Sequence, residues 1–191
     1  MFLAPLNPSV CACFQKNFKI STLPNIYLGN NKLDYVETFT YLSHVIASNG
    51  SDNDDINKEM RKLCVQGNTL IRKFKFCNLD VKVNLFRSYC HSFYCCSLWA
   101  NYNVSVINKV KVVYNNIMRK LANVPVYSSA SFLFGWLGVK SFQEVRRNAC
   151  YSIMQRILES NNSLIVCLRS SAAKLCSKMW HLWHSLLYID F

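Results

Sequence analysis

Acidic residues are scarce in this sequence, and they are unevenly distributed. Ten Asp and Glu stand against 22 Lys and Arg, which gives a formal net charge of +12 over 191 residues. No acidic residue occurs in residues 1–24 or between Asp80 and Glu144. A chain this basic favours a polyanionic partner.

Glycine and proline are also rare, with five and four residues. The sequence contains no Gly-rich phosphate loop, no nucleophile elbow and no paired acid and base, so it predicts no small-molecule substrate and no cofactor.

Two long uncharged stretches, Ser88–Asn108 and Leu121–Val139, contain too many polar or helix-breaking residues to span a bilayer. We therefore expect no membrane association.

The ten cysteines do not indicate a secreted, disulfide-bonded protein. The apolar N-terminal run has no preceding basic residue and is broken by two prolines, which is unlike an export signal. We expect reduced thiols and an intracellular protein, in the nucleus or the cytoplasm. Cys90, His91, Cys95 and Cys96 are dense enough to suggest zinc, but their spacing suits no ligand set. We expect them in the core, with no metal.

The first 50 residues carry the strand-forming sequence. Residues 1–24 show no clear period and are expected to be irregular. From residue 25 onward, strand formers surround a turn at Gly29, Asn30 and Asn31, which predicts a hairpin. The following run Phe39–Ile46 has two largely apolar faces, so we expect one strand that is covered on both sides.

Beyond Gly50 the apolar period becomes helical. Helices are predicted from about Asp54 to Phe74, after Asn78 and from about Ser105 to before Pro125. In the second helix the expected core face consists of Val81, Leu85, Tyr89, Phe93, Cys96 and Trp99. A short turn capped by Ser128 or Ser129 follows, and then a long helix after a capping box of Ser141 and Glu144. A break at Asn161 and Asn162 precedes a final helix.

The fold class predicted is therefore mainly α, with a short N-terminal β-hairpin and strand segment followed by a bundle of about four to five helices. We divide the chain into an irregular segment 1–24, a strand segment 25–50, a helical domain 51–160 and a C-terminal helical extension 161–191. Asp54 and Asp55 are interpreted as carboxylates at a helix start rather than as metal ligands.

The window that lacks acidic residues carries a formal charge of +7. If the second and third helices pack side by side, its basic residues can form a ridge that contacts nucleic-acid phosphates, with Tyr102 and Tyr114 interleaved for sugar and base contacts. The alternative is an ordinary solvated basic face. The candidate residues are Lys82, Arg87, Lys109, Lys111, Arg119, Lys120 and Lys140.

The segment FTYLSHVI, residues 39–46, resembles the block that follows the catalytic palm in reverse transcriptases of non-LTR (LINE-type) retrotransposons. That block has the pattern Phe-Lys-Tyr-Leu-Gly followed by an apolar strand. Later segments resemble, in the same order, the thumb and the helical region after it; they begin SDNDDINKEM, VKVNLFRSYC, KVVYNNIMRK and FQEVRRNACY. The resemblance covers about residues 25–165.

The resemblance implies a primer grip formed by Phe39, Tyr41 and Leu42, and a helical thumb that follows an RNA or DNA template–primer duplex. Thr40 and Ser43 replace the family's Lys and Gly, which removes a cation and puts the local backbone turn in doubt. The catalytic Asp pair and the third palm Asp of the family are expected upstream of residue 25, where this sequence has no carboxylate.

Two interpretations remain open from the sequence. In the first, the chain is a fragment of an RNA-directed DNA polymerase that lacks the catalytic palm, is not an enzyme, and binds template–primer, in one version together with a separate palm and fingers polypeptide. In the second, it is a structural or protein-interaction helical domain with no nucleic-acid role.

Overall fold

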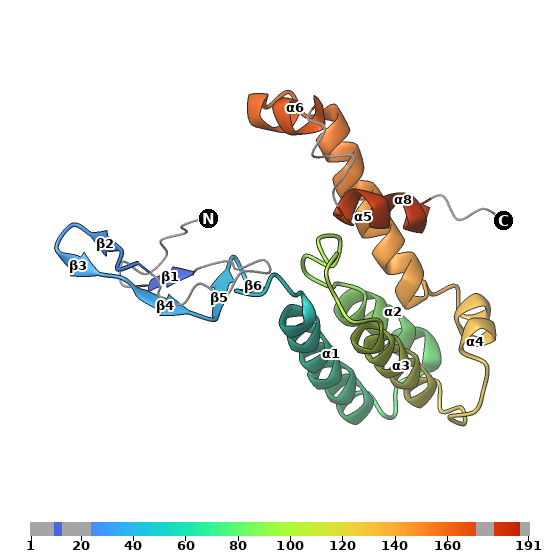
Figure 1. Cartoon of the computed structure of the whole chain (residues 1–191). Coiled ribbons are helices and arrows are strands. Elements are labelled where there is room, and N and C mark those ends of the chain that lie inside the picture. Colours follow the sequence, from blue (N-terminus) through green and yellow to red (C-terminus); the bar gives the residue numbers. More distant parts are fainter. Residues whose placement is uncertain (1–9, 13–23, 171–177, 188–191) are drawn as a thin grey trace. The chain divides into compact units, whose positions relative to one another are not determined.

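The computed structural model describes residues 10–12, 24–170 and 178–187. Within this part the chain is mainly helical, with short strands before the helices, as predicted (Figure 1). It divides into two compact units, Met1–Asp55 and Ile56–Phe191. None of the helices described is both long enough and apolar enough to cross a membrane.

The first unit contains three pairs of short strands. β1 (Val10–Ala12) pairs in parallel with β4 (Asp34–Val36), and β2 (Tyr27–Leu28) forms the predicted hairpin with β3 (Asn31–Lys32). Gly29 occupies the turn of that hairpin at φ +62°, a conformation that glycine adopts without steric cost. β1 lies inside the segment expected to be irregular; the rest of residues 1–23 falls outside the described residues.

The single strand predicted over Phe39–Ile46 is wrong, because these residues form a second hairpin. β5 (Thr38–Tyr41) pairs antiparallel with β6 (His44–Ala47), and Tyr41 lies opposite His44. The two residues between them, Leu42 and Ser43, have φ values of +45° and +64°. Positive φ at both central residues is the signature of a type I′ two-residue turn, a conformation that favours glycine over serine or leucine.

The expectation that both faces of this segment are covered is also wrong. The reversal at Leu42 puts the motif at the tip of a hairpin rather than inside a sheet. Leu42 and Tyr41 are 67% and 44% exposed, whereas Phe39 is partly buried. Apolar residues at a hairpin tip have no second layer of structure to pack against.

Asp55 lies at the start of a helix as expected, but its carboxylate is buried and bonded to a strand. It lies in the first turn of α1 (Asn53–Lys73), as predicted, but its carboxylate is 1% exposed. One oxygen accepts a hydrogen bond from the backbone N–H of Val45 at 2.9 Å, and the other lies 3.0 Å from Nδ1 of His44. These two bonds satisfy the buried carboxylate and hold it to the first residues of β6.

The helices begin where polar side chains can accept bonds from their free N–H groups. Asn78 caps α2 (Leu79–Cys90), Asn103 caps α3 (Val104–Leu121), and Ser129 caps α4 (Ala130–Trp136). The predicted capping box of Ser141 and Glu144 is confirmed at the start of α5 (Phe142–Glu159). The predicted break at Asn161 and Asn162 falls between α5 and α6 (Ser163–Ser170), and α8 (Lys178–Leu187) follows.

The core face predicted for the second helix is largely wrong. α2 ends at Cys90, and its buried residues are Val83, Phe86 and Cys90, while Tyr89 is 53% exposed. Phe93, Cys96 and Trp99 are buried, but they belong to the turns that follow α2. The buried carboxylate of Glu59 accepts the backbone N–H of Tyr94 at 3.3 Å, and this bond stabilises the non-helical segment.

One large core joins α1, α2, α3, α4 and the start of α5, and a smaller one joins α5 to α8. Helices α1, α2 and α3 lie side by side (Figure 1). In α3, the buried residues include Val110, Ile117 and Leu121. In the smaller core, the indole N–H of Trp183 donates to the carbonyl of Ser97 at 2.7 Å.

Gly67 of α1 packs directly against Ile117 of α3. A Cβ atom at this position would lie 2.5–2.8 Å from three side-chain carbons of Ile117, which is itself buried. We expect Gly67→Ala to lower the free energy of unfolding by about 1–3 kcal/mol, because the helices must separate or Ile117 must leave its packed position. Urea unfolding followed by circular dichroism measures the change.

Gly135 provides the matched control, because it also lies in a helix but has no atom within 4 Å of its added Cβ. Gly135→Ala should raise the free energy of unfolding by about 0.5–1 kcal/mol through helix propensity. Equal effects of the two substitutions would contradict the proposed close contact.

The hairpin of β5 and β6 yields a second prediction. Ser43→Gly should slow amide hydrogen exchange in β5 and β6 about fivefold, since the left-handed conformation costs a non-glycine residue about 1–2 kcal/mol and glycine recovers most of it. Ser43→Ala keeps the Cβ and removes the hydroxyl, so it should give no such protection. Equal protection in both variants would contradict the explanation that backbone strain at Ser43 weakens the hairpin.

Candidate nucleic-acid interface

The excess positive charge belongs entirely to the helical unit. Residues 56–191 contain 19 Lys and Arg and five Asp and Glu, a formal charge of +14, whereas residues 1–55 contain three and five, a formal charge of −2. Attraction to a polyanion is therefore a property of the helices. The strand unit, which includes the hairpin that resembles a primer grip, has no net attraction for phosphate.

In the strand unit, the three predicted contact residues take different positions. Tyr41 ends β5 and Leu42 starts the turn, and both are exposed, while Phe39 is partly buried in β5 opposite Ile46. The hairpin tip thus presents one aromatic and one aliphatic side chain. These groups can contact a base or a sugar but supply no cation.

The basic residues of α3 do not form one ridge. Side chains two positions apart on an α-helix differ by about 200° in direction, so Lys109 and Lys111 lie on opposite flanks of the exposed surface. Lys120 is eleven positions after Lys109 and returns to within about 20° of it. All three are exposed, and no hydrogen bond or ion pair engages their amines in the part of the chain described.

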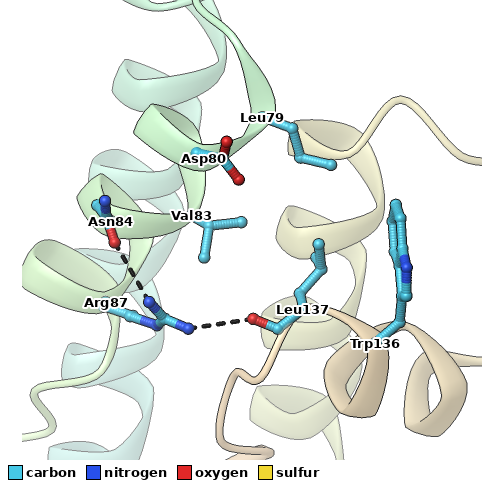
Figure 2. Close-up of a pocket in the computed structure, with 7 residues that line it drawn as sticks. All are labelled: Leu79, Asp80, Val83, Asn84, Arg87, Trp136 and Leu137. Atoms are coloured by element: carbon cyan, nitrogen blue, oxygen red, sulfur yellow. Dashed lines mark hydrogen bonds between the residues drawn. The ribbon is translucent and has the colours of Figure 1, made fainter.

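Arg87 is an architectural residue. Its guanidinium donates to the carbonyls of Leu137 and Gly138 at 3.1 and 3.0 Å and to the side chain of Asn84 at 3.2 Å. Figure 2 shows its side chain extending from α2 to the carbonyl of Leu137 at the end of α4. These residues line a pocket of 470 Å³. Three of the five N–H donors of Arg87 are thereby used to connect α2 to the segment before α5.

Arg119 is held in a similar way. Its Nε donates to the carbonyl of Ser128 at 2.9 Å and its Nη1 to the side-chain oxygen of Asn116 at 2.8 Å, so it connects α3 to the loop before α4.

The two tyrosines predicted to contact sugars and bases also have internal roles. Tyr114 is 0% exposed, and the ring and hydroxyl of Tyr102 both contact the guanidinium of Arg146.

The remaining two predicted cations lie in α2 and just before α5. Lys82 is partly buried in α2 and has no ion pair among residues 24–170 and 178–187.

Lys140 is exposed and close to two titratable groups. Burial lowers the pKa of His91, and the positive charges of Arg87 and Lys140 lower it further. The hydrogen bond from the Ser141 N–H lowers the pKa of Glu144, with Lys140 contributing, so this carboxylate offsets part of the Lys140 charge.

The most extensive basic surface that we find was not predicted, and it lies on α1. Lys58, Arg61, Lys62, Arg72 and Lys73 all project within about 60° of the direction of Lys58, at 100° per residue, and all but the partly buried Lys58 are exposed. The acidic residue among them, Glu59, is buried and turned toward Lys62 and Tyr94. The signal in the sequence is the spacing of these cations, which repeats at three and four residues through the helix. We call these five residues the α1 basic face.

The prediction that Cys90, His91, Cys95 and Cys96 lie in the core is half right, because His91 and Cys95 are only partly buried. Cys90 and Cys96 are buried, and burial raises the pKa of each thiol to about 12. No group of three or more His, Cys, Asp or Glu that could hold a metal ion occurs in the part of the chain that the structure describes. Trp180 and His184 of α8 make a ring contact at 5.1 Å.

Comparisons of the chain with protein-family models, with curated proteins and with solved structures return no match.

Removing the side-chain bonds of Arg87 should affect stability more than removing an exposed cation does. Arg87→Gln is expected to lower the free energy of unfolding by about 1–2 kcal/mol, because two carbonyl acceptors lose a charged donor. Lys109→Gln, which has no partner to lose, should change it by less than about 0.5 kcal/mol. Thermal unfolding of both variants measures the difference, and similar values would show that Arg87 does not connect α2 to this segment.

Proposed function

We propose that this chain is a non-catalytic nucleic-acid-binding fragment of a non-LTR retrotransposon reverse transcriptase, and that its helical unit binds the phosphates of a template–primer duplex. The observation that carries the proposal is the segregation of charge: +14 in the helical unit against −2 in the strand unit. The family assignment rests on the ordered sequence resemblance described above.

The α1 basic face has dimensions that suit a nucleic-acid strand. From Lys58 to Lys73 the helix axis advances about 22 Å at 1.5 Å per residue. One strand of a duplex presents about six phosphates over that length, at 3.4 Å per phosphate along the axis. Cations spaced along one helix face can therefore contact successive phosphates, and such contacts position a duplex without reading its sequence.

The hairpin of β5 and β6 contributes in a different way under this proposal. Its unit carries a formal charge of −2 and its tip presents Tyr41 and Leu42, so a contact with the primer terminus would be through stacking and apolar packing. Thr40, where the family pattern has Lys, is exposed and uncharged. The charge-based part of binding thus belongs to the helices.

The non-catalytic part of the proposal follows from the chemistry of phosphoryl transfer. Two-metal catalysis needs carboxylates that hold both ions, and residues 1–24, which precede the segment that resembles the primer grip, contain none. Primer extension with the purified chain and Mg²⁺ should give no template-dependent incorporation. Incorporation that co-purifies with the chain and survives removal of contaminants would overturn this part.

The binding part is tested by the salt dependence of affinity for an RNA–DNA duplex, measured by fluorescence anisotropy. The triple variant Arg61→Gln, Lys62→Gln and Arg72→Gln should reduce the slope of log K against log salt by about 2 to 3, because each lost phosphate contact removes about 0.9. The triple variant Lys109→Gln, Lys111→Gln and Lys120→Gln removes the same charge from α3 and serves as the matched control.

The two triple variants also separate the competing interpretations. If the α3 triple variant reduces the slope of log K against log salt more than the α1 triple variant does, the duplex is bound by α3 rather than by α1. Weak binding with an unchanged slope in both variants would favour a structural or protein-interaction domain whose cations are only solvated.

A further inference from the structure

A pocket of 300 Å³ opens beside the α1 basic face, between α1 and the last turn of α2. Its walls combine apolar side chains with an aromatic ring, an amide and an ammonium group. The residues that line it include Val65, Gln66, Thr69, Lys73 and Tyr89.

The pocket leaves large apolar side chains in water. Val65 is 67% exposed and Tyr89 is 53% exposed, although the neighbouring Leu70 is buried in the core. An exposed aromatic ring over an apolar floor is a surface on which the flat ring of a nucleic-acid base can stack.

The polar groups of the pocket are partly available. Thr69 donates its hydroxyl to the carbonyl of Val65 at 2.8 Å, so its oxygen remains only as an acceptor. The amide of Gln66, half buried, makes no hydrogen bond in the described part of the chain and can offer both a donor and an acceptor to a base edge. Lys73 lines the pocket with an exposed ammonium group.

We infer that this pocket binds the base of an unpaired nucleotide, stacked on Tyr89, with Gln66 at its edge and Lys73 on an adjacent phosphate. The inference rests on the proposed function and extends it, because it names single-stranded nucleic acid next to the duplex as the preferred ligand. Unpaired bases are accessible to aromatic side chains, whereas bases within a duplex are stacked on one another.

Charge complementarity favours a nucleotide over other occupants. Arg61 and Lys62 lie one turn before Val65 along α1, and Arg72 and Lys73 lie one turn after Thr69, so cations flank the pocket at both ends. A nucleotide within a strand has a phosphate on each side of its base, which matches this arrangement. The pocket is at the small end of the range for ligand sites, which suits one planar ring.

Tyr151 supplies a matched control for the central residue. It is 54% exposed on α5, against 53% for Tyr89 on α2, and it does not line this pocket. Substituting either tyrosine by Leu removes one exposed ring from a helix surface. Only Tyr89→Leu should affect a nucleotide in the pocket, and Tyr89→Phe should behave like the parent chain because stacking needs the ring and not the hydroxyl.

The experiment compares a blunt RNA–DNA duplex with the same duplex that carries a five-nucleotide single-stranded overhang containing 2-aminopurine. For the parent chain the overhang should raise affinity about tenfold and quench the 2-aminopurine fluorescence through stacking. Tyr89→Leu should abolish both effects and leave blunt-duplex affinity unchanged, while Tyr151→Leu keeps both. Lys73→Gln should weaken the overhang effect about threefold and lower its salt dependence.

Three outcomes would overturn the inference. One is an overhang effect that is equal in Tyr89→Leu and Tyr151→Leu with both proteins folded by circular dichroism. Another is Tyr89-dependent binding of an acidic amphipathic peptide together with no overhang effect, which makes the pocket a protein-docking site. The third is photocrosslinking of 5-iodouracil in the overhang to a residue outside the pocket. Failure of the proposed function is a separate result, since it appears as no salt-sensitive binding to the blunt duplex.

Discussion

The buried side chain of Tyr114 is the contact on which the helical unit depends. Tyr114 belongs to α3, and the centroid of its ring lies 5.0–6.1 Å from the centroids of five other rings. These rings come from α2, the segment after it, α4 and α5, and they belong to Phe86, His91, Phe93, Phe134 and Phe142. The hydroxyl of Tyr114 donates to the carbonyl of Lys140 at 2.8 Å, and burial raises the pKa of the phenol, so the donor proton stays in place. Without this partner the buried hydroxyl would cost about 1–3 kcal/mol.

The helical unit has few carboxylates, and three of its five have structural uses: Glu59 is buried and accepts the N–H of Tyr94, Glu144 closes the capping box, and Asp80 lies in the first turn of α2. Apart from Lys62, which lies 3.6 Å from Glu59, and Lys140 near Glu144, they do not offset the exposed lysines and arginines of α1 and α3. The cations that remain on α1 and α3 therefore create a field that mobile salt or a polyanion must balance.

The predictable parts of the fold are those governed by local chemistry. The caps at Asn78, Ser129 and Ser141 followed from side chains within a few residues of one another. The hairpin at Leu42 and Ser43 did not, because both are poor residues for a left-handed turn and the flanking sequence forms strands on either side. The end of α2 was also missed, since it is stabilised by Glu59, 35 residues before its partner Tyr94.

The sequence by itself determined that the chain is mainly helical, that its charge is strongly positive and where most helices begin, because propensity, periodicity and capping act over one or two turns. Only the tertiary structure decided which cations are available. Arg87 and Arg119 are engaged by backbone carbonyls 50 and nine residues away, whereas Arg61 and Arg72 project from one exposed helix face. A long side chain reaches whichever acceptor the fold brings near it, and sequence spacing does not reveal that acceptor.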